Sequence, residues 1–263
     1  RILQYPAAPI AMKGNLPPIQ MLWLGGPLST LERLSLASFL HNGHAVHLYA
    51  YDDIADVPEG TMLMDAGEII SLADMRTMTS GERHGSWAPF SNIFRYKLLH
   101  ERGGIWCDTD VVCLKALDFA VNADYFFASE FAFVPPGEKS QTIATSCAMC
   151  TPAGSPLMKD CLGSALAVDL RSADWGASGV ALLRNKLPQY QLTRALLQPN
   201  VFCPVSNWKF TMLLSELHTL PFDSYAIHFY NEMWRKNFFD KNACYEPFSV
   251  YERLKAHYLG GQD

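Results

Sequence analysis

The sequence predicts an α/β fold in which helices flank a mostly parallel central sheet. An apolar run over residues 19–24 has the length of a buried strand and ends at a glycine pair. Apolar residues then recur at helical spacing up to Gly43, and a second apolar run follows over 45–51. Such a strand–helix–strand unit implies neighbouring parallel strands and a right-handed crossover. Because ligands of open sheets bind beyond the carboxyl ends of the strands, we expect a site near residues 23–26 and 51–53.

Later segments continue the alternation of strands and helices. Strands are predicted over residues 61–64, 105–107, 125–128, 145–150 and 226–229, and extended chain over 111–114. Helices are predicted over 90–102 and 248–259, and a mainly helical region over 152–197. Residues 81–89 are predicted to form a loop. The helix over 90–102 carries an apolar face and ends at Gly103 and Gly104, which are typical helix terminators.

Length and composition indicate an ordinary globular protein. The chain has 263 residues, of which 49% are hydrophobic and 18% charged, enough for one large domain with a substantial core. Its net charge of −5, without any run of like charges, argues against a nucleic-acid-binding protein. No apolar run approaches the ~20 residues of a membrane span, and no signal peptide is visible.

The seven cysteines indicate a reducing compartment, because they are odd in number and scattered. Cys147 and Cys150 form a C-x-x-C pair, but no second pair or histidine follows at zinc spacing, so we interpret both as small core residues. The absence of an N-glycosylation sequon agrees with a cytoplasmic protein.

Asp108 and Asp110 are the first candidates for a functional site. They follow the apolar run 105–107, and in an extended chain residues two apart face the same side. Two carboxylates held this close repel one another, and a divalent cation with a preference for oxygen ligands, Mg²⁺ or Mn²⁺, would relieve the repulsion. A bare D-x-D is common by chance, so the alternative is a solvated turn.

The preceding helix adds a second observation. Asn92 and Arg95 are three residues apart and therefore share one face, away from the apolar stripe. Arg95 would be a fixed cation beside a phosphate or sugar, although a surface arginine is the alternative. Glu130 follows a predicted strand and could meet an acceptor or lie beside the reacting carbon, but it is equally compatible with a surface carboxylate.

Four segments together resemble the family 32 glycosyltransferases. Residues 90–110 resemble the sugar-binding D-x-D region of this family, which includes bacterial capsular and lipopolysaccharide sugar transferases and relatives of the α-1,4-galactosyltransferases. Residues 18–26 resemble the opening strand, 175–179 the W-G-x-T-G-P segment, and 227–234 the closing H-x-x-N-x-x-W segment. The D-x-D region is also similar, more remotely, to the large glucosylating toxins.

The resemblance implies a GT-A fold with a Rossmann-like sheet in a single catalytic domain over 1–263. A nucleotide-binding half would span about 15–115 and an acceptor-side half about 116–263. It also implies a retaining transfer of a hexose or N-acetylhexosamine from a UDP-sugar, with Mn²⁺ or Mg²⁺, to a hydroxyl of a glycan or glycolipid. For a lipid-linked acceptor, we expect peripheral contact with the inner face of the cell membrane through Arg235, Lys236 and Lys241.

The resemblance also implies roles for individual residues. Asp110 would be a direct metal ligand. Asp108 would contact the ribose or sugar and reach the metal through a water molecule, and His228 would be the third metal residue, near the pyrophosphate. The donor-binding residues would be Trp23, Leu24 and Gly25 around the base, Asn92, Arg95, Ser178 and Gly179 near the sugar, and Asn231 and Trp234 near the β-phosphate or sugar. Together with Glu130, the catalytic set would be Arg95, Asp108 and Asp110.

Two departures from the family pattern leave alternatives open. Asn92 stands where most members carry Asp, and Asn keeps the hydrogen-bonding reach but loses the charge. Ser178 and Val180 replace the usual Thr and Pro, which are milder changes. The alternatives are a protein-modifying, toxin-like glycosyltransferase and a nucleotide-sugar-binding protein that lacks transfer activity.

Overall fold

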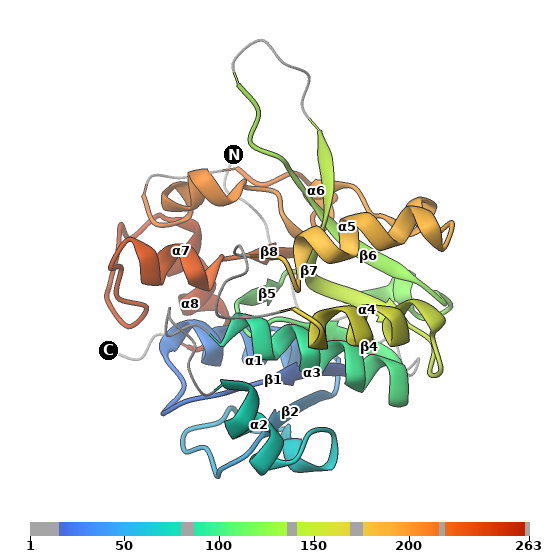
Figure 1. Ribbon diagram of the computed structural model, residues 1–263. Helices are drawn as coiled ribbons and strands as arrows, with labels where there is room; N and C mark the ends of the chain where they lie inside the picture. The colour runs from blue at the N-terminus through green and yellow to red at the C-terminus, as the bar shows by residue number, and fades with distance from the viewer. Residues whose placement is uncertain (1–15, 80–86, 136–140, 169–175, 216–218, 261–263) are drawn as a thin grey trace.

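A six-stranded sheet forms the centre of the protein. The computed structural model describes residues 16–79, 87–135, 141–168, 176–215 and 219–260 (Figure 1). The sheet contains β1 (Ile19–Leu22), β2 (Val46–Ala50), β3 (Thr61–Asp65), β4 (Gly104–Cys107), β6 (Phe126–Phe131) and β7 (Thr142–Thr151). Their order is β3-β2-β1-β4-β7-β6, and only β7 runs against the others. This arrangement confirms the predicted α/β class with a mostly parallel sheet.

Helices cover both faces of this sheet. They are α1 (Thr30–His41), α2 (Leu72–Thr79), α3 (Ala88–Glu101), α4 (Pro156–Leu166), α5 (Val180–Gln189), α6 (Pro199–Phe202), α7 (Asn231–Lys236) and α8 (Val250–Tyr258). Short 3₁₀ turns, η1 (Ala66–Glu68), η2 (Asp118–Ala120), η3 (Thr193–Ala195) and η4 (Asn207–Leu213), connect some of them. Within the described ranges, no helix has the length and hydropathy to cross a membrane.

Strand alternation sorts the core into two layers. On β4, Ile105 and Cys107 point into the core shared with α1 and α6, whereas Trp106 points into the core shared with α3, α4 and α5. The side chain of Trp106 therefore lies on the same face of the sheet as the helix that carries Arg95. A third core joins the outer side of α1 to α7 and α8.

A second, two-stranded sheet lies beside the first. The chain that leaves β4 enters β5 (Val111–Cys113), which pairs antiparallel with β8 (Ala226–His228). Val111 is opposite His228 in this register. The predicted strand over 226–229 is thus present, and its pairing brings a segment from near the end of the chain next to the D-x-D motif.

The C-terminal segment is also attached to the start of α1. Ser29 and Glu32 form a capping box there, and the Asn242 side-chain oxygen accepts a hydrogen bond of 2.9 Å from the Thr30 N–H. Lys241 forms an ion pair with the buried Glu32, and its ammonium lies 5.6 Å from the centre of the Trp23 ring. These contacts hold residues 241–242 against the end of β1.

Several predicted boundaries differ from the structure. The first strand ends at Leu22, two residues earlier than predicted, because the chain bends at Gly25. Pro89 is in the first turn of α3, where the backbone N–H has no partner within the helix, so a proline is tolerated there. Because α3 begins at Ala88, the predicted loop over 81–89 ends before that residue. Residues 80–86 and 169–175 lie outside the described residues; what remains of the predicted region 152–197 forms α4, α5 and η3.

Gly103 makes the tight passage from α3 to β4 possible. Its φ of +65° favours glycine, and an added Cβ would lie 2.4 Å from the Ala153 backbone nitrogen. Its carbonyl also accepts a hydrogen bond of 2.8 Å from the Gln20 side chain in β1. Backbone atoms cannot move aside easily, so this glycine fixes where β4, and the aspartates after it, begin.

We predict that Gly103→Ala destabilises the protein far more than Gly154→Ala. Gly154 has a similar φ of +75°, but an added Cβ would meet no atom there. Gly154→Ala should therefore lose only the free energy that a positive φ costs a residue with a side chain, about 1–2 kcal/mol. Gly103→Ala adds a backbone clash and should lose about 3 kcal/mol or more. Urea unfolding followed by circular dichroism measures both. Equal losses for the two variants would contradict the close approach.

Candidate active site

A pocket of about 540 Å³ opens beyond the carboxyl ends of β1 and β4. Its wall combines residues from eight parts of the chain: Leu22–Leu24, residues 87–95 at the start of α3, Trp106–Asp110, Thr145 and Ser146 on β7, Val168, Gly176–Val180, Asn207, and a C-terminal stretch from His228 to Lys241. The volume is in the range of small-molecule sites, which is about 300–1,000 Å³. The position agrees with the expectation for an open α/β sheet.

The D-x-D motif is a turn and not the predicted extended chain. The Val111 N–H donates to the Asp108 carbonyl at 3.1 Å, which closes the turn between β4 and β5. Asp108 and Asp110 therefore lie near each other because the chain reverses between two sheets. The two residues of this segment that do point to the same side are Trp106 and Asp108. The Trp106 indole N–H donates a hydrogen bond of 2.8 Å to Asp108 Oδ1.

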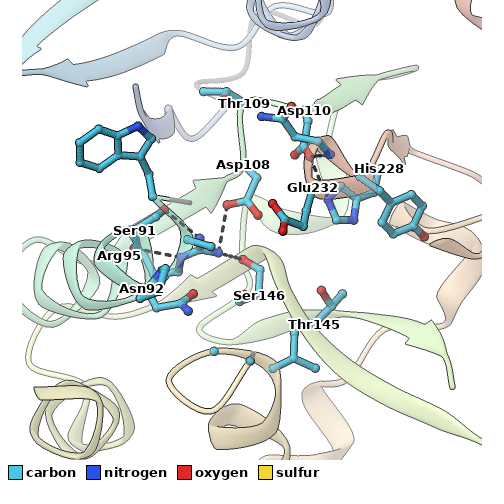
Figure 2. Close-up of a pocket in the computed structure, with 18 of the residues that line it drawn as sticks. Ser91, Asn92, Arg95, Asp108, Thr109, Asp110, Thr145, Ser146, His228 and Glu232 are labelled. Carbon is cyan, nitrogen blue, oxygen red and sulfur yellow. Dashed lines mark hydrogen bonds and ion pairs between the residues drawn. The ribbon is translucent and has the colours of Figure 1, made fainter. Parts of the chain in front are cut away.

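Arg95 is a buried partner of Asp108. Its side chain is 5% exposed, its Nη1 lies 3.0 Å from Asp108 Oδ1, and the guanidinium lies over the Trp106 ring. The same group donates to the Ser146 carbonyl at 2.6 Å and to the Ser91 hydroxyl at 2.9 Å (Figure 2). The surface-arginine alternative is thus wrong. Most of the N–H groups of Arg95 already donate to protein atoms, so Arg95 mainly holds the Asp108 carboxylate in position.

Asp110 is held from the opposite side. Its Oδ2 accepts a hydrogen bond of 2.6 Å from the Asn231 N–H at the start of α7 and lies 3.3 Å from His228 Nε2. Its Oδ1 is buried without a hydrogen-bond partner, and so is His228 Nδ1. An unpartnered buried carboxylate oxygen is unfavourable, so Oδ1 of Asp110 is suited to a ligand that the protein itself does not supply.

Charge interactions shift the pKa values of these groups in opposite directions. Burial alone would raise the pKa of Asp110, but the positive His228 and the hydrogen bonds from His228 and Asn231 hold it below its usual value. Burial would likewise lower the pKa of His228, yet the Asp110 carboxylate raises it well above the ordinary range. The pKa of Asp108 is raised by burial and by Asp110 in spite of Arg95. Burial and the neighbouring carboxylate therefore outweigh the stabilisation that Arg95 and His228 give to the charged form of Asp108.

The residues present suit a divalent cation. One ligand atom each from Asp108, Asp110 and His228 lies within 4.8 Å of the other two. Carboxylate oxygens suit Mg²⁺ and Mn²⁺, and an imidazole is a common additional ligand for transition metals. His228 must lose its proton to coordinate an ion, so binding would release a proton.

The two motifs around Asn92 and Ser178 meet in the pocket. The Asn92 amide donates to the Ser178 hydroxyl at 3.2 Å, and both side chains are buried. An added Cβ on Gly179 would lie 2.6 Å from the Asn92 amide nitrogen, so a larger residue here would displace the Asn92 side chain. Trp175, which belongs to the same motif, lies outside the described residues.

Other predicted residues occupy different places. Trp23, Leu24 and Asn231 line the pocket. Trp234 also borders it, but its ring is buried among aromatic residues and its N–H donates to the Phe229 carbonyl at 2.8 Å, which leaves no donor for a ligand. Gly25, Gly26 and residues 51–53 are absent from the lining, so the expected site extends along the end of β1 but not along the end of β2.

Glu130 is neither exposed nor in the wall of the pocket. It is buried, and Asn207, which does line the pocket, donates to its Oε2 at 3.5 Å. Burial raises the pKa of the Glu130 carboxyl. The surface-carboxylate alternative is therefore wrong, and Glu130 reaches the site only through a neighbour.

Sequence reasoning missed several residues of the pocket wall. They are Trp87, Ser91, Thr109, Thr145, Ser146, Tyr230, Glu232 and Lys241. The Glu232 carboxylate points into the pocket beside Asp108 (Figure 2), and it accepts hydrogen bonds from Arg235. Glu232 follows Asn231 directly, so its position in the closing motif was the available signal. Ser146 contributes its backbone carbonyl to Arg95, and no sequence pattern predicts such a contact.

The comparisons with known proteins agree with this site. A family model described as "Glycosyltransferase sugar-binding region containing DXD motif" matches residues 54–127. The matched segment includes Asn92, Arg95, Asp108 and Asp110, so the chain carries a D-x-D region of the glycosyltransferase type. The match covers less than a third of the chain. No curated protein sequence matches the chain significantly.

Distant similarity to solved structures is illustrated by three of those that match. One, described as PaToxG glycosyltransferase, has 16% identity and a TM-score of 0.48 over 68% of this chain and 76% of that chain. A UDP-bound glycosyltransferase domain from the YGT toxin has 9% identity and a TM-score of 0.39 over 95% and 88%. A transferase with two cysteine-to-serine substitutions has 12% identity and a TM-score of 0.36 over 68% and 87%. Similarity this low assigns no residue roles.

We predict that Arg95→Met destabilises the protein by about 3 kcal/mol, because it leaves the Asp108 carboxylate partly buried without its cation. The double variant Arg95→Met/Asp108→Asn should be more stable than Arg95→Met alone, since the uncompensated charge is gone. Urea unfolding of the two single variants and the double variant measures the coupling. Strictly additive effects would contradict a structural ion pair.

Proposed function

We propose that this protein is a metal-dependent glycosyltransferase that moves a hexose or N-acetylhexosamine from a UDP-sugar to a hydroxyl of a glycan or glycolipid. The main support for this proposal is that Asp108, Asp110 and His228 lie together in a pocket large enough for a small-molecule ligand, where one Asp110 oxygen is buried without a hydrogen-bond partner. Either carboxylate could be explained as structural by itself. Their convergence with a histidine from the other end of the chain supports a cation site, and the D-x-D family match supports the class of reaction.

Different side chains of the pocket would bind different parts of the donor. Asp110 and His228 would hold Mn²⁺ or Mg²⁺, which when bound supplies Lewis-acid stabilisation of the departing diphosphate. Asp108 keeps one oxygen on Trp106 and Arg95, so its other oxygen is available to the donor. Trp23 and Leu24 would border the base, and Asn92 with Ser178 would meet the sugar from the opposite wall.

We further propose that the transfer retains the configuration of the sugar, and the pocket favours a front-face route over a double displacement. A double displacement needs a free carboxylate beside the reacting carbon. Glu232 points into the pocket, but both of its oxygens accept hydrogen bonds from Arg235, at 2.6 and 2.9 Å, and Glu130 is outside the wall. In the front-face route that we propose, the bond from the acceptor oxygen to the sugar carbon forms on the face from which the diphosphate leaves. The acceptor proton passes to the departing phosphate oxygen.

A lipid-linked acceptor and contact with the cytoplasmic face of a membrane remain part of this proposal. The basic residues expected to serve that contact are engaged in ion pairs: Arg235 and Lys236 with Glu232, and Lys241 with Glu32. A vesicle-flotation measurement with anionic lipids tests this part separately from catalysis.

We predict that a panel of UDP-sugars yields UDP release with Mn²⁺ present, that EDTA abolishes it, and that Asp110→Asn lowers the rate at least about 100-fold. Asn keeps the shape of the side chain but removes the charge and one strong ligand. Asp74→Asn, on α2 and outside the pocket, is the matched control and should keep the full rate. Release that survives both EDTA and Asp110→Asn would contradict the cation site.

A nucleotide-sugar-binding protein without transfer activity is the second candidate. Asn92 favours it, because this uncharged residue faces the proposed sugar position and already donates to Ser178. We predict that calorimetric titration with UDP and Mn²⁺ detects binding under either function. Binding without turnover of any donor, in glycan, glycolipid or protein acceptor mixtures, would favour the binding protein over the enzyme.

A further inference from the structure

Two buried thiols lie next to His228. Cys147 is on β7 and Cys203 follows α6, and their Sγ atoms are 3.9 Å apart. Both residues are about 1% exposed. One ring nitrogen of His228 lies within 4.8 Å of each sulfur. Three segments distant in the sequence thus bring two sulfur atoms and one imidazole together, in addition to the cluster that His228 forms with the aspartates.

The spacing of the sulfur atoms corresponds to a tetrahedral metal site. With Zn–S bonds of about 2.3 Å, two sulfur ligands of a tetrahedral zinc ion lie roughly 3.8 Å apart, close to the distance observed. A disulfide would require a separation of about 2.05 Å, so the sulfurs would have to approach by almost 2 Å. Two thiolates and one imidazole form a soft donor set, which selects Zn²⁺ over Mg²⁺ and Mn²⁺.

We propose that Cys147, Cys203 and His228 form a second cation site, specific for a thiophilic divalent ion such as Zn²⁺. On binding, each thiol and the His228 imidazolium release one proton to solvent, so two thiolates balance the charge of the divalent ion and a neutral imidazole completes the three protein ligands. His228 lines the pocket, which gives the ion a path from solvent. Three protein ligands leave a fourth position for water.

The shared imidazole couples this site to the D-x-D cluster. His228 belongs to both groups of ligands, and its Nε2 lies 3.3 Å from Asp110. An ion held by the thiols competes for His228 with an ion held by the aspartates. Zn²⁺ should therefore inhibit sugar transfer that Mn²⁺ supports. This inhibition depends on the proposed function, whereas binding at the thiols does not.

Binding is tested without any donor, on reduced protein, with Co²⁺ as a spectroscopic probe. A Cys244→Ser background removes the exposed cysteine. We expect one equivalent of Co²⁺ to produce thiolate-to-cobalt charge-transfer absorption that Zn²⁺ abolishes. Cys203→Ser and Cys203→Ala should each weaken Co²⁺ binding at least about 100-fold, since loss of even a supporting contact costs 10–100-fold. Thermal unfolding by circular dichroism checks that both variants fold.

Cys150→Ser and Asp110→Asn are the matched controls. Cys150 is on the same strand as Cys147 and is also buried, but its sulfur contacts the Ala123 carbonyl. Asp110 belongs only to the oxygen-rich cluster. Both variants should keep the charge-transfer absorption. Absence of this absorption in the background protein, or equal absorption in Cys203→Ser, would overturn the proposal.

Inhibition is tested separately, at fixed Mn²⁺ with increasing Zn²⁺. Half-inhibition should require at least about tenfold more Zn²⁺ in Cys203→Ser than in Cys150→Ser, while the rates without Zn²⁺ stay equal. Equal inhibition of the two variants would contradict competition for His228. A protein that binds Co²⁺ through its thiols but turns over no donor would refute the proposed function and leave the second cation site standing.

Discussion

The buried contact between Asp110 and His228 is the constraint on which the site depends. It connects the turn after β4 with β8, two segments separated by more than a hundred residues, and the β5–β8 pairing holds the two in register. Each group stabilises the charged form of the other, as the opposite shifts of their pKa values show. Without this contact Asp110 would lose its charged partner and keep only the hydrogen bond from the Asn231 N–H.

The two aspartates differ because their surroundings differ. Asp108 is joined to the helix side of the sheet through Arg95 and Trp106, and part of it faces the pocket. Asp110 is joined to the second sheet and to the start of α7, and one of its oxygens has no partner. The pair is therefore assembled from two independent supports. A cation between them would satisfy the unpartnered oxygen of Asp110.

His228 lies between two sets of possible ligands of opposite chemical character. Asp108 and Asp110 offer hard oxygen atoms, whereas Cys147 and Cys203 offer soft sulfur atoms. A single imidazole is an acceptable ligand for either kind of ion. The identity of the ion that His228 serves is then decided by which set competes better. The same residue connects the proposed transfer reaction with sensitivity to thiophilic metals.

Local rules were sufficient for the strands of the central sheet, for the helix before the D-x-D motif and for the choice of Arg95 as a site residue. Its ion pair with Asp108 was not predicted. Hydrophobic periodicity and glycine terminators act over a few residues, so one sequence shows them directly. Three features were not predictable, because each depends on tertiary contacts. They are the turn at the D-x-D motif, the burial of Glu130 and the hydrogen bond from the Trp234 indole to the Phe229 carbonyl. The sequence by itself determined which side chains could bind a cation and a sugar donor. Only the tertiary structure decided that His228 meets both the aspartates and the thiols, since strand pairing and core packing bring together residues that no local pattern relates.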